Sequence, residues 1–166
     1  MGSCLYQRYR FFRHNFSSMF HVSLINTPSF SLDTVRIEEI FHVVENAVEK
    51  PQNGTINIAF LDDSMIQALN KQYRKKDATT DVLSFHYFDD FSHCKSDETV
   101  WEIVMSDALI QSQAHKQWHS PTNECEILII HALLHILGYD HETDEDFRDM
   151  WEKEWAIRRR LELSVA

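Results

Sequence analysis

The hydrophobic residues of this chain recur with two periods, which together predict four β-strands interspersed with helices. Short runs rich in β-branched and aromatic residues predict strands, over residues 20–26, 55–61, 82–87 and 100–105. Apolar residues at helical spacing predict helices. The first covers residues 33–50, and the second begins at residue 62 or 63 and continues into the basic segment 69–77. The others cover residues 107–118, 121–137 and 142–163. We expect an α+β fold, in which helices pack on a small four-stranded sheet that is mostly parallel or mixed.

Two of these helices carry further signals. The apolar run 126–137 predicts a buried helix. Ser120 and Pro121 suit its start, and Gly138 suits the left-handed conformation that ends a helix. The last helix, residues 142–163, is acid-rich, and its apolar residues are predicted to face inward, namely Phe147, Trp151, Trp155 and Ile157. We interpret the acidic stretch Asp140 to Glu154 as a solvated helix face.

Composition indicates a single globular domain. The chain has 166 residues, of which 43% are hydrophobic, enough for one core. A formal net charge of −10 argues against a protein that coats nucleic acid by bulk electrostatics, but not against an enzyme whose basic residues gather in one cleft. Cys4, Cys94 and Cys125 form no C-x-x-C pair, which favours free thiols in a reducing compartment, and we expect a cytoplasmic protein. No apolar run approaches the roughly 20 residues of a membrane span.

Residues 1–18 differ from the rest, which we assign to one domain over residues 19–166. Arg8, Arg10 and Arg13 alternate with aromatic residues, and no acidic residue occurs among them. This composition fits a basic arm that contacts RNA or a transit-like leader, and it fits a secretory signal poorly. Met19 offers a simpler interpretation, which we favour: the natural chain starts there, and residues 1–18 are an extension foreign to the domain.

Three histidines have the spacing of a metal site. His131 and His135 are four residues apart on the predicted buried helix, so both imidazoles lie on one face. After the turn at Gly138, His141 is placed to return toward them. Three neutral imidazoles that converge on one point form the open, catalytic kind of zinc site, which leaves a fourth position for water. The alternative is that these are two core histidines and one loop histidine.

The residue after the first histidine decides between two kinds of chemistry. The spacing H-x-x-x-H-x-x-G-x-x-H matches that of metzincin proteases, which have a glutamate directly after the first histidine as general base. Ala132 stands at that position and accepts no proton. A peptidase would therefore need another base.

A basic cluster offers a different assistant. Arg74 presents a fixed fork of donors that matches two phosphate oxygens and stabilises charge that develops on phosphorus. Lys71, Lys75 and Lys76 around it would steer a polyanion toward the metal. The sequence alone leaves equal room for Arg74 as a solvated charge at a helix end.

Three segments of the chain resemble the YbeY family of metal-dependent endoribonucleases: Leu69-Asn-x-x-Tyr73-Arg74-x-Lys76-Asp77, Thr80-Asp81-Val82-Leu83-Ser84-Phe85, and His131-x-x-Leu134-His135-x-Leu137-Gly138-Tyr139-Asp140-His141. The resemblance spans most of residues 20–160. It implies a single-domain α+β fold, one zinc ion per chain on the three histidines, and cleavage of single-stranded RNA.

The resemblance also implies a biological role. The family acts in ribosomal RNA maturation, notably at the 3′ end of the small-subunit (16S) RNA, and in ribosome quality control, with the small subunit as partner. The arginine that matches Arg74 takes part in catalysis or RNA binding. By this resemblance we expect His131 and Arg74 to be catalytic, and Arg74, Lys71, Lys75 and Lys76 to bind substrate. The acidic stretch would repel RNA, so we expect the substrate on the Arg74 side.

The chain departs from the family pattern at several positions. Ala132 replaces a glycine, a change that a helix tolerates. Thr79-Thr80 stands where Pro-Thr is usual, and His86 where proline is usual. Trp101-Glu102 replaces Gly-Asp before the fourth strand, which puts a bulky indole where the backbone comes close to the expected cleft.

The remaining candidates are weaker. His115 and His119 are four apart but lack a third ligand, and we interpret them as exposed helix residues. His86 and His93 flank the loop at residues 88–98, and the simpler interpretation is surface histidines. Asp140 fits either an orienting partner for an imidazole or an ordinary turn aspartate.

Two other functions stay open beside the endoribonuclease. One is a ribosome-assembly factor whose zinc is structural and whose Arg74 serves docking. The other is a metzincin-like peptidase. The oligomeric state is not predicted.

Overall fold

The computed structural model of the protein describes residues 20–48, 53–88 and 93–163. The strands and helices follow one another in the order that the sequence predicts, with bounds that differ by a few residues. In chain order they are β1 (Phe20–Leu24), α1 (Thr34–Val48), β2 (Gly54–Leu61), α2 (Asp63–Arg74), β3 (Val82–His86), β4 (Thr99–Ser106), α3 (Asp107–Gln117), α4 (Pro121–Ile136) and α5 (Asp144–Arg160). Residues 1–18, for which an extension was predicted, lie outside the described part.

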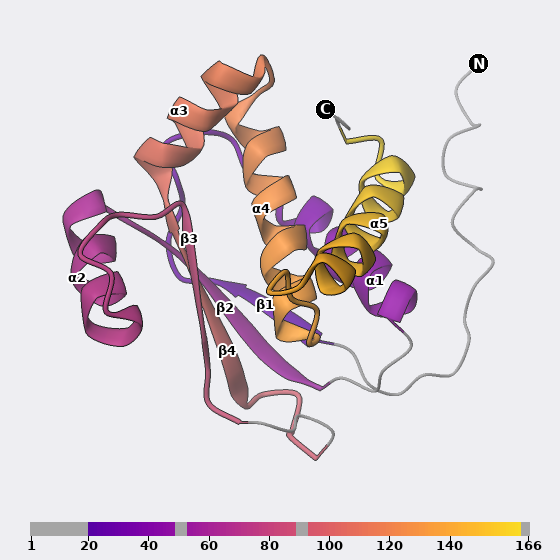
Figure 1. Cartoon of the computed structure of the whole chain (residues 1–166). Helices are drawn as coiled ribbons and strands as arrows, with labels where there is room; N and C mark the ends of the chain where they lie inside the picture. Colours follow the sequence, from indigo (N-terminus) through magenta and orange to yellow (C-terminus); the bar gives the residue numbers. More distant parts are fainter. Residues whose placement is uncertain (1–19, 49–52, 89–92, 164–166) are drawn as a thin grey trace, which may run out of the picture.

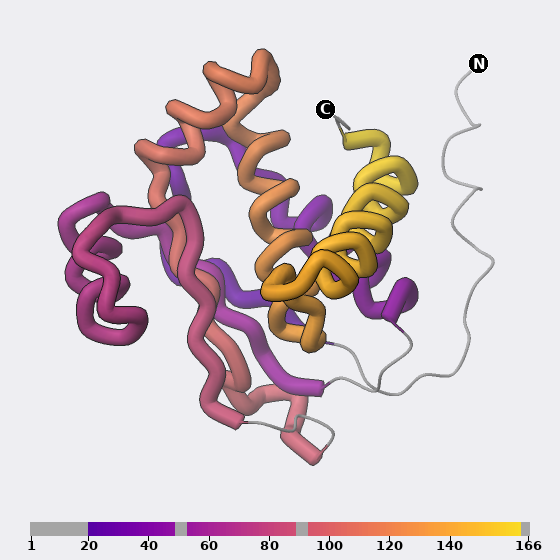
Figure 2. Tube along the Cα trace, in the orientation of Figure 1, coloured from indigo at the N-terminus to yellow at the C-terminus, as the bar shows by residue number. Residues whose placement is uncertain are grey.

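The four strands form one mixed sheet in the order β1-β2-β4-β3. The strands β1, β2 and β4 are parallel, and β3 pairs antiparallel with β4 along one edge. Figure 2 follows the chain from β2 through α2 to β3 and then to β4, so that β4 enters the sheet between two earlier strands. The prediction of an α+β fold with a mostly parallel or mixed sheet is confirmed.

The two faces of the sheet differ in what covers them. In Figure 1, α1, α4 and α5 lie on one side of the sheet, and α2 lies on the other. The burial pattern of strand β2 reflects this difference between the two faces, because its residues alternate between buried and half-buried along its whole length. Ile56, Ile58 and Phe60 face the main core, whereas Asn57 and Ala59 face the side that α2 covers only in part.

Helix α4 is the centre of the main core. Nearly all of its residues from Glu124 onward are buried, apart from its two histidines. The side chain of Ser120 accepts a hydrogen bond from the backbone N–H of Asn123, and Pro121 occupies the first turn. At the other end Gly138 has a φ of +90°, a conformation that a side chain would strain. Both predicted ends of this helix are confirmed.

The predicted inward face of α5 is wrong for its aromatic residues. Ile157 is buried, together with Met150 and Leu161. Phe147, Trp151 and Trp155 are exposed instead. The helix carries two apolar stripes, and it has only one face against α4 and α1. The stripe Met150–Ile157–Leu161 occupies that face, so the aromatic stripe remains on the surface.

The two cysteines of the described part, Cys94 and Cys125, are both buried. None of the described helices is long and apolar enough to cross a bilayer.

Candidate active site

The three predicted metal ligands converge. His131 and His135 lie one turn apart near the end of α4, and His141 comes back to them after the turn at Gly138. One nitrogen from each ring lies within 4.8 Å of the other two, and the Nε2 atoms of His131 and His135 are 3.1 Å apart. The predicted convergence of these imidazoles is confirmed.

The donor set fits a divalent metal. Two nitrogens that bind one tetrahedral zinc ion lie about 3.3 Å apart, close to the spacing of the two Nε2 atoms. Burial, and then the neighbouring His131 and His141, lower the pKa of His135 below its ordinary value. A lowered pKa favours the neutral imidazole, which is the form that binds a metal. His131 and His135 are half-buried and His141 is exposed, so the site opens to solvent on one side.

A carboxylate on α5 supports the first histidine. Glu154 Oε2 lies 3.1 Å from His131 Nδ1, and the guanidinium of Arg158 donates to the other carboxylate oxygen at 3.2 Å. Burial acts to raise the pKa of Glu154, but the hydrogen bonds and charges of His131 and Arg158 outweigh it and lower the pKa. An ionised carboxylate at Nδ1 holds the ring proton there, which leaves the Nε2 lone pair for a metal.

Sequence reasoning missed Glu154. It was assigned to a solvated acidic face, and that interpretation is wrong for this residue, because its side chain is largely buried against α4. Asp140 makes both of the contacts expected for it, one with the turn and one with an imidazole. Its carboxylate accepts the backbone N–H of His141 at 2.8 Å, and it lies 3.9 Å from His135 Nδ1. The shorter contact stabilises the turn that returns His141 to the site.

Replacing Glu154 with glutamine tests this support. We expect Glu154→Gln to weaken metal binding about 10- to 100-fold, because a neutral amide polarises the His131 ring less and no longer pairs with Arg158. Competition of the protein with a chelator of known affinity measures the change. Glu152→Gln, an exposed position on the same helix, is the matched control. Equal metal affinity in the two variants would contradict the role of Glu154.

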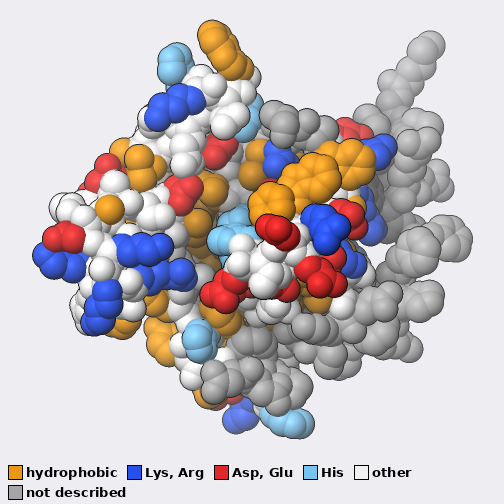
Figure 3. Space-filling model, in the orientation of Figure 1, with side chains coloured by type: hydrophobic (Ala, Val, Ile, Leu, Met, Phe, Trp, Pro, Cys, Tyr) orange, Lys and Arg blue, Asp and Glu red, His pale blue; other side chains and the backbone are white. Residues whose placement is uncertain are grey.

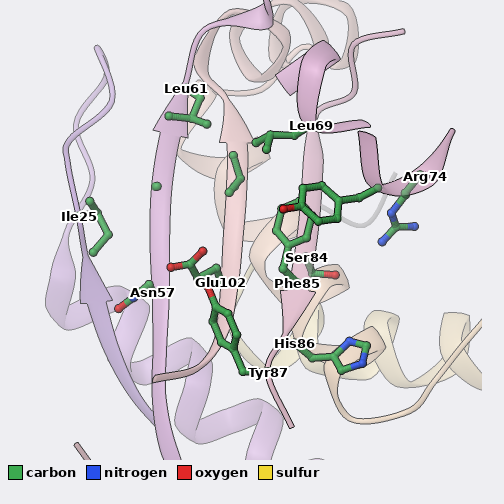
Figure 4. Close-up of a pocket in the computed structure, with 13 residues that line it drawn as sticks. Ile25, Asn57, Leu61, Leu69, Arg74, Ser84, Phe85, His86, Tyr87 and Glu102 are labelled. Carbon is green, nitrogen blue, oxygen red and sulfur yellow. The ribbon is translucent and has the colours of Figure 1, made fainter. Parts of the chain in front are cut away.

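A cleft of about 690 Å³ lies on the open face of the sheet. Its floor comes from β2, β4 and β3, and its wall from the end of α2, as Figure 4 shows. Its lining is Ile25, Asn57, Ala59, Leu61, Leu69, Tyr73, Arg74, Ser84, Phe85, His86, Tyr87, Glu102 and Val104. Strand β3 lies between the cleft and the helix that carries His131 and His135, because β3 lines the cleft and also contacts α4.

Arg74 is the predicted cation best placed for a phosphate. It is the last residue of α2, and its guanidinium lies beside β3 at the same edge of the cleft as His86 (Figure 4). Among the described residues, none forms an ion pair or a hydrogen bond with this guanidinium. Lys71 is different, because its ammonium pairs with Asp77 at 2.6 Å. Arg74 therefore keeps its donors available for a ligand.

The lysines around Arg74 lie on the surface. Lys75 ends α2 in the left-handed conformation, with a φ of 60°, and its ammonium donates to the carbonyl of Gln72. Lys76 follows it and is exposed. In Figure 3 lysine and arginine side chains gather over α2, histidine side chains lie near the middle of the same face, and hydrophobic side chains lie between them.

The substitution at Trp101-Glu102 affects the cleft differently from the expectation. Trp101 is buried in the main core, where its ring lies 5.0 Å from that of His86. The indole is therefore directed away from the floor of the cleft. Glu102 is the residue that lines the cleft. Its side chain interacts with Tyr87, whose pKa is raised first by burial and then by this carboxylate.

The interpretation of His119 as an exposed helix residue is wrong. Helix α3 ends at Gln117, and Trp118 in the left-handed conformation turns the chain back. His119 then contacts the carboxylate of Glu124 at the start of α4, and both side chains are largely buried. His115 remains exposed on α3. The pair has no common face, so it does not form a second metal site.

Known proteins resemble this chain over most of its length. The family profile described as Endoribonuclease YbeY matches residues 26–162. An Endoribonuclease YbeY of Carboxydothermus hydrogenoformans is 39% identical over 137 residues, which cover 79% of this chain and 93% of that protein. A second one, of Thermoanaerobacter sp., is 33% identical over 154 residues, which cover 84% of this chain and 97% of that protein.

A solved structure agrees with the fold. The solution structure of TM1509 from Thermotoga maritima superposes with a TM-score of 0.54 over 87% of this chain and 92% of that one, at 22% sequence identity. Its agreement concerns the fold alone. The profile match and the two relatives concern the family, and with the converging histidines they establish that this chain belongs to the YbeY endoribonuclease family.

Proposed function

We propose that this protein is a zinc-dependent endoribonuclease that cleaves single-stranded RNA and acts in ribosomal RNA maturation. The observation that supports the proposal is that β3 lines the cleft that holds Arg74 and also contacts α4, the helix that carries His131 and His135. On one side are three imidazoles, one of them held by Glu154. On the other is Arg74, at the edge of a cleft of about 690 Å³.

The histidines, Glu154 and Arg74 have separate roles in the proposed reaction. His131, His135 and His141 would hold the zinc ion, and Glu154 keeps the proton of His131 on Nδ1. A zinc ion there supplies Lewis-acid stabilisation of charge on a phosphate oxygen and raises the acidity of water. Arg74 binds the phosphate with two parallel hydrogen bonds and stabilises the charge that develops in the transition state.

The cleft supports an unpaired substrate. Bases of single-stranded RNA are free to turn outward and stack on aromatic side chains, which paired bases are not. Tyr73, Phe85 and Tyr87 line the cleft beside Arg74, and the Tyr73 and Phe85 rings lie 5.0 Å apart. The small-subunit RNA, and in particular the region of its 3′ end, is the substrate that we propose in the cytoplasm, with the small subunit itself as partner.

The metzincin-like peptidase has less support. The carboxylate that contacts His131 does so at Nδ1, on the side of the ring opposite Nε2. Glu154 is therefore placed to orient the ring and not to remove a proton from water at the metal. Ala132, at the position of the protease glutamate, is buried in the core.

Cleavage of matched RNA substrates tests the proposal. We expect the protein as purified to contain about one zinc per chain. We further expect it to cleave a single-stranded RNA much faster than the same RNA annealed to its complement. A chelator should abolish cleavage, and zinc should restore it while magnesium does not. Equal cleavage of both substrates, or cleavage that resists the chelator, would contradict it. A 2′,3′-cyclic phosphate on the products would identify the RNA 2′-hydroxyl as the attacking group in the first step.

A further inference from the structure

Helix α5 exposes three aromatic side chains in one line. Phe147, Trp151 and Trp155 are four residues apart, so they lie on one strip of the helix, which we call the aromatic ridge. Their exposed fractions are 55%, 55% and 39%. The core side of α5 is a different stripe, headed by Met150 and Ile157. The aromatic ridge is thus not needed to pack the helix in the described fold.

The two indoles of the aromatic ridge are arranged in parallel. The ring centroids of Trp151 and Trp155 are 6.3 Å apart, and the ring planes differ by 22°. The guanidinium of Arg159 lies 4.6 Å from the centre of the Trp155 ring, which restrains it further. Flat apolar surfaces that are ordered before binding lose little conformational entropy when a ligand stacks on them.

Charged side chains of both signs lie beside the aromatic ridge. Arg148 lies three residues before Trp151, and Arg159 lies four residues after Trp155 and contacts its ring, so both are neighbours of the ridge on the helix surface. Glu152 lies three residues before Trp155 and borders the ridge as well, whereas Asp149 lies about 160° round the helix from Trp151. The ridge therefore carries arginines that can pair with phosphate, within a surface of mixed charge.

The aromatic ridge is continuous with the metal site. Trp151 and Trp155 flank Glu154 at i−3 and i+1, and Glu154 contacts the ring of His131. Figure 3 shows a line of hydrophobic side chains over α5 that starts beside the histidines and ends near lysine or arginine side chains. The basic cluster over α2 lies on the opposite side of the histidines on the same face.

We propose that the aromatic ridge is a stacking platform for unpaired bases of the RNA on one side of the cleaved phosphate. Arg74 and its lysines hold the backbone on the other side. This inference rests on the proposed function, and it adds the path of the RNA strand across the protein surface. Every base has a π face, so stacking needs no particular sequence, and arginines between aromatic residues suit RNA better than an apolar protein surface. It also alters the expected approach of the substrate, which would contact α5 as well as the Arg74 side.

The double variant Trp151→Ala with Trp155→Ala tests the stacking. Loss of two stacked bases should raise the KM for single-stranded RNA about tenfold or more, while kcat stays within about twofold. Trp151→Phe with Trp155→Phe should restore most of the affinity. Trp118→Ala is the matched control, because this tryptophan, directly after α3, is 92% exposed and lies outside the ridge. Circular dichroism checks that each variant folds.

A second measurement does not depend on cleavage. Titration of the holoenzyme with single-stranded RNA should quench tryptophan fluorescence in the wild type and in Trp118→Ala, and much less in the double alanine variant. RNA with abasic sites on one side of the cleaved phosphate lacks the bases that would stack on the ridge. The wild type should therefore bind it as weakly as the double alanine variant binds intact RNA. The double variant should bind the abasic and the intact RNA equally well.

The outcomes separate this inference from the proposed function. If the wild type cleaves single-stranded RNA and the double alanine variant has an unchanged KM and unchanged quenching, the stacking platform is overturned and the proposed function stands. If the wild type does not cleave but its fluorescence is quenched through the ridge, the proposed function fails and RNA stacking stands. If the variants lose only self-association, the ridge is an interface between copies of the chain, which overturns the inference.

Discussion

His131→Ala is expected to remove both the bound metal and RNA cleavage. The variant leaves two imidazoles where three converge, and it also leaves the carboxylate of Glu154 without the ring that it orients. Loss of an orienting partner alone costs about 10- to 100-fold in metal affinity or activity, so loss of a ligand should cost about a thousandfold or more. Elemental analysis and the initial rate of cleavage of single-stranded RNA measure the two effects.

His115→Ala provides the comparison for this variant. His115 is exposed on α3 and outside the converging set, so its removal should change neither metal content nor rate. The proposed site would be wrong if His131→Ala kept a full complement of zinc and cleaved RNA at the wild-type rate. If the variant kept the metal but lost cleavage, His135 and His141 would be sufficient to bind the metal. The metal would then have a structural role.

Arg74→Glu is expected to lower cleavage by about a hundredfold or more without loss of metal. The substitution replaces a donor for phosphate oxygens with a carboxylate that repels them, and removal of a single preorganised donor already costs about 10²–10³ in rate. Arg74→Lys should lie between the two, because an ammonium keeps the charge but not the two parallel hydrogen bonds. Rates at saturating and at limiting RNA separate an effect on kcat from one on KM.

The matched control reverses a charge elsewhere on the surface. Lys116 is an exposed cation on α3, and Lys116→Glu changes the net charge by the same amount as Arg74→Glu. It should cleave RNA nearly as fast as the wild type. Comparison of ribosome association in the same variants tests the assembly-factor alternative. Lost association with unchanged cleavage in Arg74→Glu would favour docking as the role of this arginine.

Local patterns in the sequence predicted the elements and the histidine convergence. The spacing of His131 and His135 fixes their common face within one helix, and Gly138 supplies the turn that His141 needs. Such relations involve a few neighbouring residues, so the backbone geometry of a helix and a turn determines them. The strands followed in the same way from their alternating residues.

Relations between distant segments were not predicted. Glu154 is 23 residues from His131, and the contact exists only because α5 packs on α4 in one rotation. Periodicity assigned Phe147, Trp151, Trp155 and Ile157 to one inward face of α5, but it gives no indication that the core accepts the stripe with Met150 and Ile157 instead. Trp101 and Glu102 are adjacent in sequence and face opposite sides of the sheet, which required the position of β4 in the strand order.

The hydrogen bond between His131 and Glu154 also makes metal binding and the folding of the C-terminal third a single linked equilibrium. A metal ion at the three histidines would be held by residues before and after the turn at Gly138, and its first ligand contacts Glu154 of α5. Any opening that separates α5 from α4 must therefore give up affinity for the ion. At a free metal concentration of 100 times the Kd, this linkage adds about 2.7 kcal/mol to the free energy of that opening. A metal ion at this site would then stabilise the packing of α5 as well as take part in catalysis. Removal of the metal would destabilise α5 and the aromatic ridge together.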